Sequence, residues 1–263
     1  MYYIQLDIRP TGGLTFRRMP GSILHIATYP FLPPSTMSGY LRRLLMLAGG
    51  HYPNTTVGDA PYYVLPWPRY HVLGAYPVPR HAYRIHTTHR HGPKYQTKHT
   101  AFSKLVHKQP DKAKERNEQQ LQLHTWEYLF VERLRGYVLS ESEEALKPLC
   151  ELVNLGSKLG KEGYGYVEVV SEVRQLRQEK VPAMPSVLTP ASELVGKPAD
   201  FVFLYRHEHR QDRNISSVDL SQDPNPEVTG FVPFWGGWPA EPVPLDYWTD
   251  DEVFFPVAVL EVF

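Results

Sequence analysis

LVNLGSKLGKEGYGYVEVV (residues 152–170) joins an apolar, helix-like segment to an alternating, strand-like one. Between them, Gly156–Tyr166 holds four glycines, two lysines and two tyrosines. Glycine lacks a Cβ, so its backbone reaches positive φ and approaches other groups closely. Such a loop can hold a phosphate on its exposed N–H groups, with Lys158 and Lys161 adding charge and Tyr164 and Tyr166 stacking on bases. The alternative is a turn whose glycines only let a helix and a strand pack together.

The loop matches neither common nucleotide-binding motif. A Walker A loop closes with G-K-[ST] and opens a helix, whereas this loop follows one. A dinucleotide fingerprint lies between a strand and the helix after it. The sequence therefore indicates neither a P-loop nor a dinucleotide-binding domain.

Two helices are predicted upstream. Pro33 and Pro34 end any earlier helix, and Ser35 is a suitable N-cap for a helix that stops at Gly49–Gly50. Its apolar stripe is Met37, Tyr40, Leu41, Leu44, Leu45 and Ala48. The second helix begins at Ser142, with a kink or a later start at Pro148. Its predicted buried face is Leu146, Leu149, Cys150 and Val153.

Strands are predicted over 2–8, 125–140 and 166–170, with edge strands or irregular β structure over 61–79. The resulting order is strand, helix, strand, strand, helix, strand. This is the ferredoxin-like (RRM-like) βαββαβ unit, an α+β fold, with an insertion between its second and third strands. We predict that this domain spans residues 1–178.

The insertion carries most of the charge asymmetry of a chain whose formal net charge is +0. Arg80–Arg116 has ten lysines and arginines, two acids and six histidines. Its low apolar content predicts a protruding hairpin or a disordered loop over about 80–120. A block this basic indicates a polyanionic partner, and its bland alternative is a solvated surface loop.

The C-terminal residues 179–263 are predicted to form a smaller β-rich region. FVFLYRHEH (201–209) and FFPVAVLEVF (254–263) have strand patterns, and 210–229 is typical of a polar surface loop. From Asn214 onward there are nine acids and no lysine or arginine. These acids would suit a basic partner subunit or keep RNA away. FWGGWPAEP (234–242) would be a stacking platform or, more commonly, a tight turn with packed rings.

Composition excludes several classes. The single cysteine, Cys150, rules out an internal disulfide framework and a Cys-rich zinc site, and its apolar setting indicates a core residue. MYYIQLDIRP has no signal-peptide pattern, and no run of about 18 apolar residues predicts a membrane span. We therefore expect a cytoplasmic protein without membrane contact.

Two motifs together resemble the RAMP superfamily of CRISPR proteins. TYPFLPPSTMSGYLRRLL (28–45) is similar to the motif that opens the first helix of the Cas-five family, and GSKLGKEGYGYVEV (156–169) is similar to the superfamily's glycine-rich loop. The resemblance covers about residues 1–175. Related type III subunits that hold the same end of the RNA share the Pro-rich turn and helix.

The resemblance implies a prokaryotic, non-enzymatic subunit of a type I interference complex (Cascade), without cofactor or metal. Such a subunit holds the 5′ handle of the guide RNA, contacts the backbone RAMP subunits through a thumb, and helps the large subunit engage target DNA near the PAM. The basic insertion would be the thumb and the glycine loop would lie under the handle. The implied RNA-binding residues are Arg17, Arg18, Arg42, Arg43, His86, His89, Arg90, His91, Lys94, Lys98, His99, Gly156, Lys158, Gly160, Lys161, Gly163, Tyr164, Gly165 and Tyr166.

Two alternatives use the same histidines. One family branch processes guide RNA, and a metal-independent endoribonuclease would need a histidine base and a cation such as Lys94 near the phosphate. HTTHRH (86–91) would instead bind zinc if its histidines converged, although Arg84, Arg90 and Lys94 crowd the site with positive charge. Stacking or phosphate contact explains the histidine cluster more simply.

Overall fold

The computed structural model describes residues 1–18, 25–50, 65–66, 68–93, 121–193, 200–205 and 231–263, with the side chains of 91–93 and 121–123 excepted. Within these residues the chain is α+β, mostly strands with two α-helices, α1 (Pro34–Ala48) and α4 (Glu143–Cys150). Neither helix is long and apolar enough to cross a membrane.

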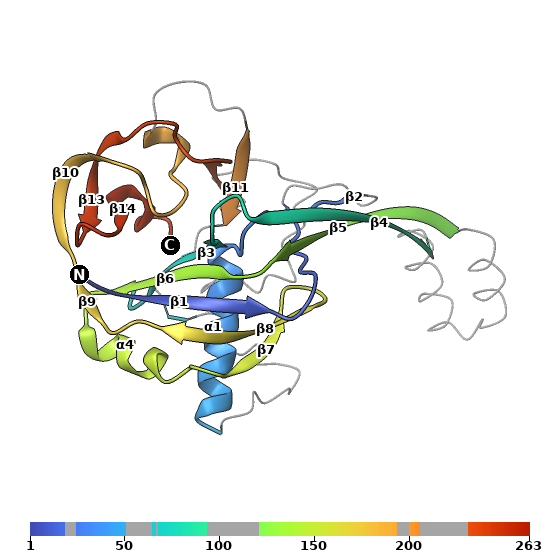
Figure 1. The fold of residues 1–263 in the computed structure, drawn as a ribbon, viewed down its shortest axis with the longest axis horizontal. Coiled ribbons are helices and arrows are strands. Elements are labelled where there is room, and N and C mark those ends of the chain that lie inside the picture. Colours follow the sequence, from blue (N-terminus) through green and yellow to red (C-terminus); the bar gives the residue numbers. More distant parts are fainter. Residues whose placement is uncertain (19–24, 51–64, 67, 94–120, 194–199, 206–230) are drawn as a thin grey trace, which may run out of the picture.

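The central sheet has β1 in its middle (Figure 1). Each neighbouring pair along the sheet is antiparallel, and β9 (Arg174–Gln175) pairs with the start of β1. The predicted strands 2–8 and 166–170 are both present, each longer than expected. The strands in spatial order are β3 (His71–Pro77), β6 (Leu134–Ser140), β1 (Tyr2–Pro10), β8 (Gly163–Val170) and β7 (Gly156–Leu159).

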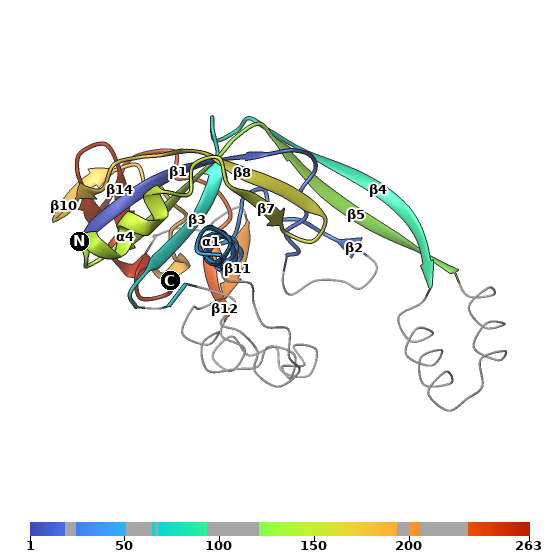
Figure 2. The ribbon, with the colours of Figure 1, turned by 90° about the horizontal axis from the view of Figure 1, so that it is seen from below.

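Helix α1 packs on one face of this sheet, and Figure 2 shows it end-on beneath the strands. Gly136 pairs with Leu6 across the sheet, and a Cβ at Gly136 would lie 2.5 Å from Met37 Cε on α1. The missing side chain therefore lets the helix approach the strands closely. Helix α4 contacts both α1 and the central strands, so the two helices share a core.

The predicted start of α1 was wrong by a short distance. The helix begins at Pro34, with Pro33 as the N-cap residue and no side-chain cap, so Ser35 lies inside the first turn. Proline suits the first helical position because its missing N–H would have no intrahelical partner there. The predicted end at Gly49 is confirmed, and Gly50 has φ of 68°.

The basic insertion is a hairpin in its described part. β4 (Tyr83–Pro93) pairs with β5 (Leu121–Val131) antiparallel, and the two form an arm that projects from the sheet (Figures 1 and 2). The two-residue β2 (His25–Ile26) adds parallel to β5. The single strand predicted over 125–140 was wrong, since the chain turns at Glu132–Arg133 between β5 and β6. No glycine or proline marks that turn. The arm therefore extends to Val131 rather than to about 120.

The second helix is capped as predicted, because Ser142 Oγ accepts a hydrogen bond from the Ala145 N–H. Leu146 and Leu149 are fully buried, whereas Val153 lies beyond the helix end and is 39% exposed. Cys150 is half-buried, and burial raises the pKa of its thiol. The predicted face was therefore correct only within the helix.

The C-terminal region packs beside the β3–β6 end of the sheet (Figure 1). Phe255 contacts Tyr3 and Tyr137 edge-on, with centroids 5.6 and 5.0 Å apart. The predicted strand over 254–263 was wrong beyond Pro256, because a 3₁₀ turn (Val257–Val259) follows. The predicted polar loop lies within residues 206–230, which are outside the described part of the chain. The strands here are β10 (Arg177–Ala183), β11 (Phe201–Tyr205), β12 (Phe231–Trp235), β13 (Val243–Thr249) and β14 (Phe254–Pro256).

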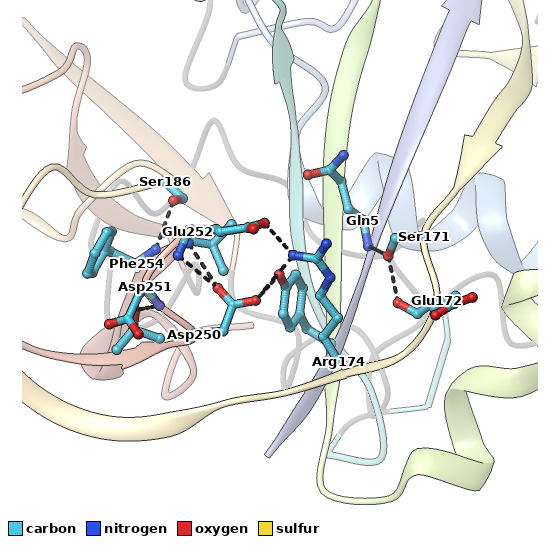
Figure 3. A network of polar contacts seen from close by, with 12 residues as sticks. Gln5, Ser171, Glu172, Arg174, Ser186, Asp250, Asp251, Glu252 and Phe254 are labelled. Atoms are coloured by element: carbon cyan, nitrogen blue, oxygen red, sulfur yellow. Dashed lines mark hydrogen bonds and ion pairs between the residues drawn. The ribbon is translucent and has the colours of Figure 1, made fainter.

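Three of the C-terminal acids pair within the chain, and Figure 3 shows two of them, Asp250 and Glu252, at Arg174. Asp250 accepts from Tyr3 Oη at 2.6 Å and lies 3.5 Å from Arg174, which also pairs with Glu252. Asp251 pairs with Arg177 at 2.5 Å. Asp250 and Glu252 fasten the C-terminal region to Tyr3 and Arg174, and Asp251 pairs within that region, so all three acids are engaged in the fold itself.

Candidate nucleic-acid interface

A basic groove of about 380 Å³ lies between α1 and the hairpin formed by β7 and β8. It contains four of the predicted cations, Arg17, Arg43, Lys158 and Lys161, and none of its lining residues is acidic. The complete lining is Thr15, Phe16, Arg17, Thr36, Gly39, Tyr40, Arg43, Lys158, Gly160 and Lys161. Three segments far apart in the sequence thus bring positive charge to one hollow.

The glycine-rich stretch is a hairpin rather than a loop followed by a strand. Gly160 has φ of 69°, and a Cβ there would lie 2.7 Å from the Thr15 carbonyl oxygen. The Lys161 N–H donates to that same carbonyl at 3.2 Å. Gly163 likewise faces Leu14, whose Cδ2 a Cβ would meet at 2.2 Å. The glycines therefore have the packing role, and this packing holds both lysines at the groove.

Helix α1 is fixed against the hairpin by Tyr40. Its buried hydroxyl donates to the Gly165 carbonyl oxygen at 2.9 Å, and burial raises the pKa of the phenol, which stays protonated. Arg43 lies about one turn further along the helix and is exposed. The Tyr40 bond thus sets the distance between Arg43 and the hairpin lysines.

Lys161 also connects the groove to the arm. Its Nζ lies 3.9 Å from the centre of the Trp126 ring on β5, which is cation–π geometry. Trp126 meets a second cation, since the Arg90 guanidinium carbon is 5.3 Å from the same ring. The Trp126 ring therefore contacts a cation of the groove, Lys161, and a cation of the arm, Arg90.

Arg90 forms an ion pair with Glu162 in the hairpin turn. Its two terminal nitrogens reach the carboxylate at 3.0 and 3.1 Å, and Tyr128 Oη donates to Glu162 at 2.7 Å. Hydrogen bonds from Tyr128 and then Arg90 lower the pKa of Glu162, and the Glu162 bond raises the pKa of Arg90. We call this contact the arm latch. In it, a cation that the resemblance implied to be RNA-binding pairs with an acid.

Tyr164 and Tyr166 share the less buried face of β8, as the alternation predicts. Tyr164 is 48% exposed, and its ring lies against Gly156, where a Cβ would meet Tyr164 Cε1 at 2.9 Å. Lys158 is directly opposite Tyr164 on β7. A cation and an accessible ring therefore stand side by side at the edge of the groove.

The arm histidines do not converge. His86 pairs with Tyr128 and His89 with Thr125, so they lie on opposite faces of the hairpin. The His86 ring meets Phe130 edge-on at 6.3 Å, and His89 Nδ1 is 3.3 Å from Thr125 Oγ1. Among the described residues, no three histidine, cysteine or acidic side chains gather closely enough to hold a metal ion.

The other predicted residues lie elsewhere. Arg18 is engaged with the C-terminal region, where it lies 3.3 Å from both Asp200 and the Phe201 carbonyl oxygen. Arg42 is half-buried on α1 and does not line the groove. His91 has a described backbone on β4 only, and Lys94, Lys98 and His99 fall outside the described residues.

A second group of charges lies on the sheet, where three arginines pair with two acids. Asp7 is 4% exposed and receives two bonds from Arg135 at 2.8 and 3.0 Å. Glu168 pairs with Arg9 at 3.1 Å and with Arg133 at 3.3 Å. We call these five residues the sheet-face cluster. Its arginines are held by acids of the same chain.

Sequence reasoning missed the acid and the rings that organise the arm root. Glu162 lies between Lys161 and Gly163 in the glycine-rich stretch, where no local pattern marks it as the partner of Arg90. Trp126 and Tyr128 alternate on a run read only as a strand. That alternation was the available signal, because it places both rings on one face of β5.

Comparisons with known proteins assign the chain to no family. No protein-family model matches the chain, and no curated protein matches it. A solved structure described as a crystal structure of a CRISPR protein from Archaeoglobus fulgidus is similar, with a TM-score of 0.38 and 12% identity over 89% of this chain and 84% of that one. A likeness at this TM-score is too weak to argue from.

Proposed function

We propose that this chain is a guide-RNA-binding subunit of a CRISPR type I interference complex, of the Cas-five kind, which holds the 5′ handle of the RNA. The observation that carries the proposal is the basic groove, where four cations from three segments meet with no acid in the lining. Positive charge of this kind binds a nucleic-acid backbone without reading its sequence. The exposed Tyr164 beside Lys158 offers a ring on which an unpaired base can stack.

The strand order supports the ferredoxin-like RAMP fold. In a βαββαβ unit of this kind two split βαβ halves interleave in one antiparallel sheet. The order β3-β6-β1-β8, with α1 and α4 in the connections, fits that arrangement, and β7 adds an edge. The arm enters between the second and third strands of the unit, where the resemblance puts the thumb.

In this proposal the arm contacts the neighbouring backbone RAMP subunit, and the chain caps that backbone beside the large subunit. Target DNA near the PAM is engaged through the assembled complex. The equivalent handle-binding subunit of a type III effector complex is the second candidate within the class, because the Pro-rich turn before α1 is common to both.

We propose binding rather than cleavage. The groove lining contains no histidine, and His86 and His89 face opposite sides of the arm. A metal-independent ribonuclease needs its base and its cation placed together at one phosphate. His86 and His89 are not brought to the groove cations, which supports binding; the side chains of the other cleavage candidates, His91, Lys94 and His99, lie outside the described part of the chain.

The test is a binding-and-cleavage assay on one gel. Labelled RNA with a repeat-derived 5′ handle of type I or type III origin is mixed with the protein at low and high salt, with chelator throughout. We expect salt-sensitive binding with the RNA left whole. Site-specific cutting in chelator would replace the proposal with the nuclease. Absence of binding at low salt, both alone and after co-expression with backbone subunits, would contradict it.

The arm is tested separately, by replacing residues 94–120 with a short Gly-Ser turn. The replacement keeps β5, whose Leu129 is fully buried and pairs with Leu14. We expect an unchanged melting temperature and the loss of co-purification with the backbone subunit. Retention of that co-purification would show that the distal arm has no assembly role.

A further inference from the structure

A second cleft, of about 390 Å³, lies between the base of the arm and the C-terminal region. Its volume is in the range of small-molecule sites. No acid lines it, and it contains none of the RNA-binding residues that the resemblance implied, but it includes Gly236–Ala240 of the run that the sequence analysis weighed as a stacking platform. It is separate from the basic groove, with which it shares no lining residue.

The wall of the cleft is aromatic and fixed. Phe31 and Tyr76 stack with centroids 5.5 Å apart, and Trp238 meets Tyr76 edge-on at 5.3 Å. Tyr76 Oη donates to the Leu73 carbonyl and accepts from the Leu188 N–H, so the buried ring cannot turn away. Tyr83, 40% exposed, lines the same cleft from the arm. Phe31 and Tyr76 are almost fully buried behind this wall, so the rings accessible to a flat ligand are those of Trp238 and Tyr83.

Arg80 supplies the polar group. Its guanidinium carbon lies 3.9 Å from the centre of the Trp238 ring, and one nitrogen donates to the Pro185 carbonyl at 2.8 Å. No described carboxylate pairs with it, although burial lowers the pKa of the group and an arginine stays charged. Its remaining donors suit an anion, and an apolar side chain from a partner would leave them unmet.

Gly237 shows that the cleft has room. A Cβ at this position would meet no atom within 4 Å, and its φ is not in the left-handed region. The residue lines the cleft and is exposed. A larger side chain at 237 therefore adds bulk to the cleft lining without a clash at its Cβ.

We propose that this cleft binds one nucleotide unit, with the base against the aromatic wall and the phosphate on Arg80. The inference rests on the proposed function where the nucleotide belongs to the bound RNA. A free nucleotide presents the same chemistry. Base–aromatic stacking and an arginine–phosphate contact are together the ordinary means of holding such a group.

The experiment compares wild type with Gly237→Leu, which adds a large side chain to the cleft lining. Gly12→Leu is the matched control, because a Cβ at Gly12 also meets no atom within 4 Å and that residue lies outside the cleft. Equilibrium dialysis measures adenosine and uridine monophosphate, and a filter assay measures a single-stranded RNA with a repeat-derived handle. We expect Gly237→Leu to weaken at least one of these affinities about tenfold at unchanged melting temperature.

The outcomes separate the sources and the two proposals. Loss of RNA affinity without mononucleotide binding assigns the cleft to a strand-borne nucleotide, and loss of mononucleotide binding alone assigns it to a free one. Equal affinities in wild type, Gly237→Leu and Gly12→Leu would overturn the inference while RNA binding by wild type leaves the proposed function standing. If the protein binds no RNA, and Gly237→Leu abolishes its mononucleotide binding, the proposed function would be contradicted and the inference about the cleft would stand.

Discussion

The basic groove and the sheet-face cluster are both rich in cations, and they differ in their acids. The groove has four cations and no acid in its lining, whereas the three arginines of the cluster are held by Asp7 and Glu168. A phosphate near the cluster would have to displace a carboxylate of the same chain. No described acid pairs with Arg43 or Lys158 in the groove, so the pairing of cations with acids, rather than their number, is what distinguishes the proposed nucleic-acid site.

The largest expected effect concerns the sheet-face cluster. Asp7→Asn removes the charge of a side chain that is almost fully buried and leaves Arg135 at most one of its two bonds, because only Oδ1 remains as an acceptor. We expect the free energy of unfolding to fall by about 3 kcal/mol, measured by urea denaturation, with RNA affinity unchanged. Glu168→Gln, at a more exposed carboxylate, is the milder comparison. A loss of RNA affinity in folded Asp7→Asn would show that the cluster also binds nucleic acid.

A smaller effect is expected at the groove wall. Gly160→Ala places a Cβ 2.7 Å from the Thr15 oxygen at a residue with φ of 69°. We expect a loss of about 2 kcal/mol in stability and weaker RNA binding, because both lysines shift. Thermal unfolding and a filter assay measure these, with Gly12→Ala as the control in open space. Full RNA affinity in the variant would mean that the position of the hairpin is unimportant for binding.

The smallest effect concerns the arm latch. The bonds from Tyr128 and Arg90 lower the pKa of Glu162, so its contribution to stability is present above the unfolded value of about 4.3 and is lost as pH falls through the lowered folded value. Because the pair is largely exposed, Glu162→Gln should remove only about 0.5 kcal/mol at pH 7. Melting temperatures of the variant and wild type should converge in acid, and a constant difference across pH would show that the latch is not ionic.

Much of the fold was readable from the sequence because its signals were local. The alternation of β1 and β8, the Ser142 cap and the Gly49 stop all depend on neighbouring residues. The turn at Glu132–Arg133 was missed because no breaker marks it within a continuous aromatic run. For the candidate site, the sequence predicted the four cations of the groove. It did not predict that Arg18 and Arg90 pair with Asp200 and Glu162, because these acids are far away in the sequence. No local pattern could distinguish these arginines from Arg43.

The most direct test of the central claim is the salt dependence of RNA affinity in two variants that each lose two charges. The first variant combines Arg43→Gln with Lys158→Gln and removes two positive charges from the groove. The second combines Arg9→Gln with Arg133→Gln and removes two positive charges from the sheet-face cluster. We expect the first variant to bind handle RNA with a log–log salt slope flatter by about 1.4, at roughly 0.7 per lost phosphate contact, and the second to keep the wild-type slope. Equal changes in both variants, or none in the groove variant, would contradict the account.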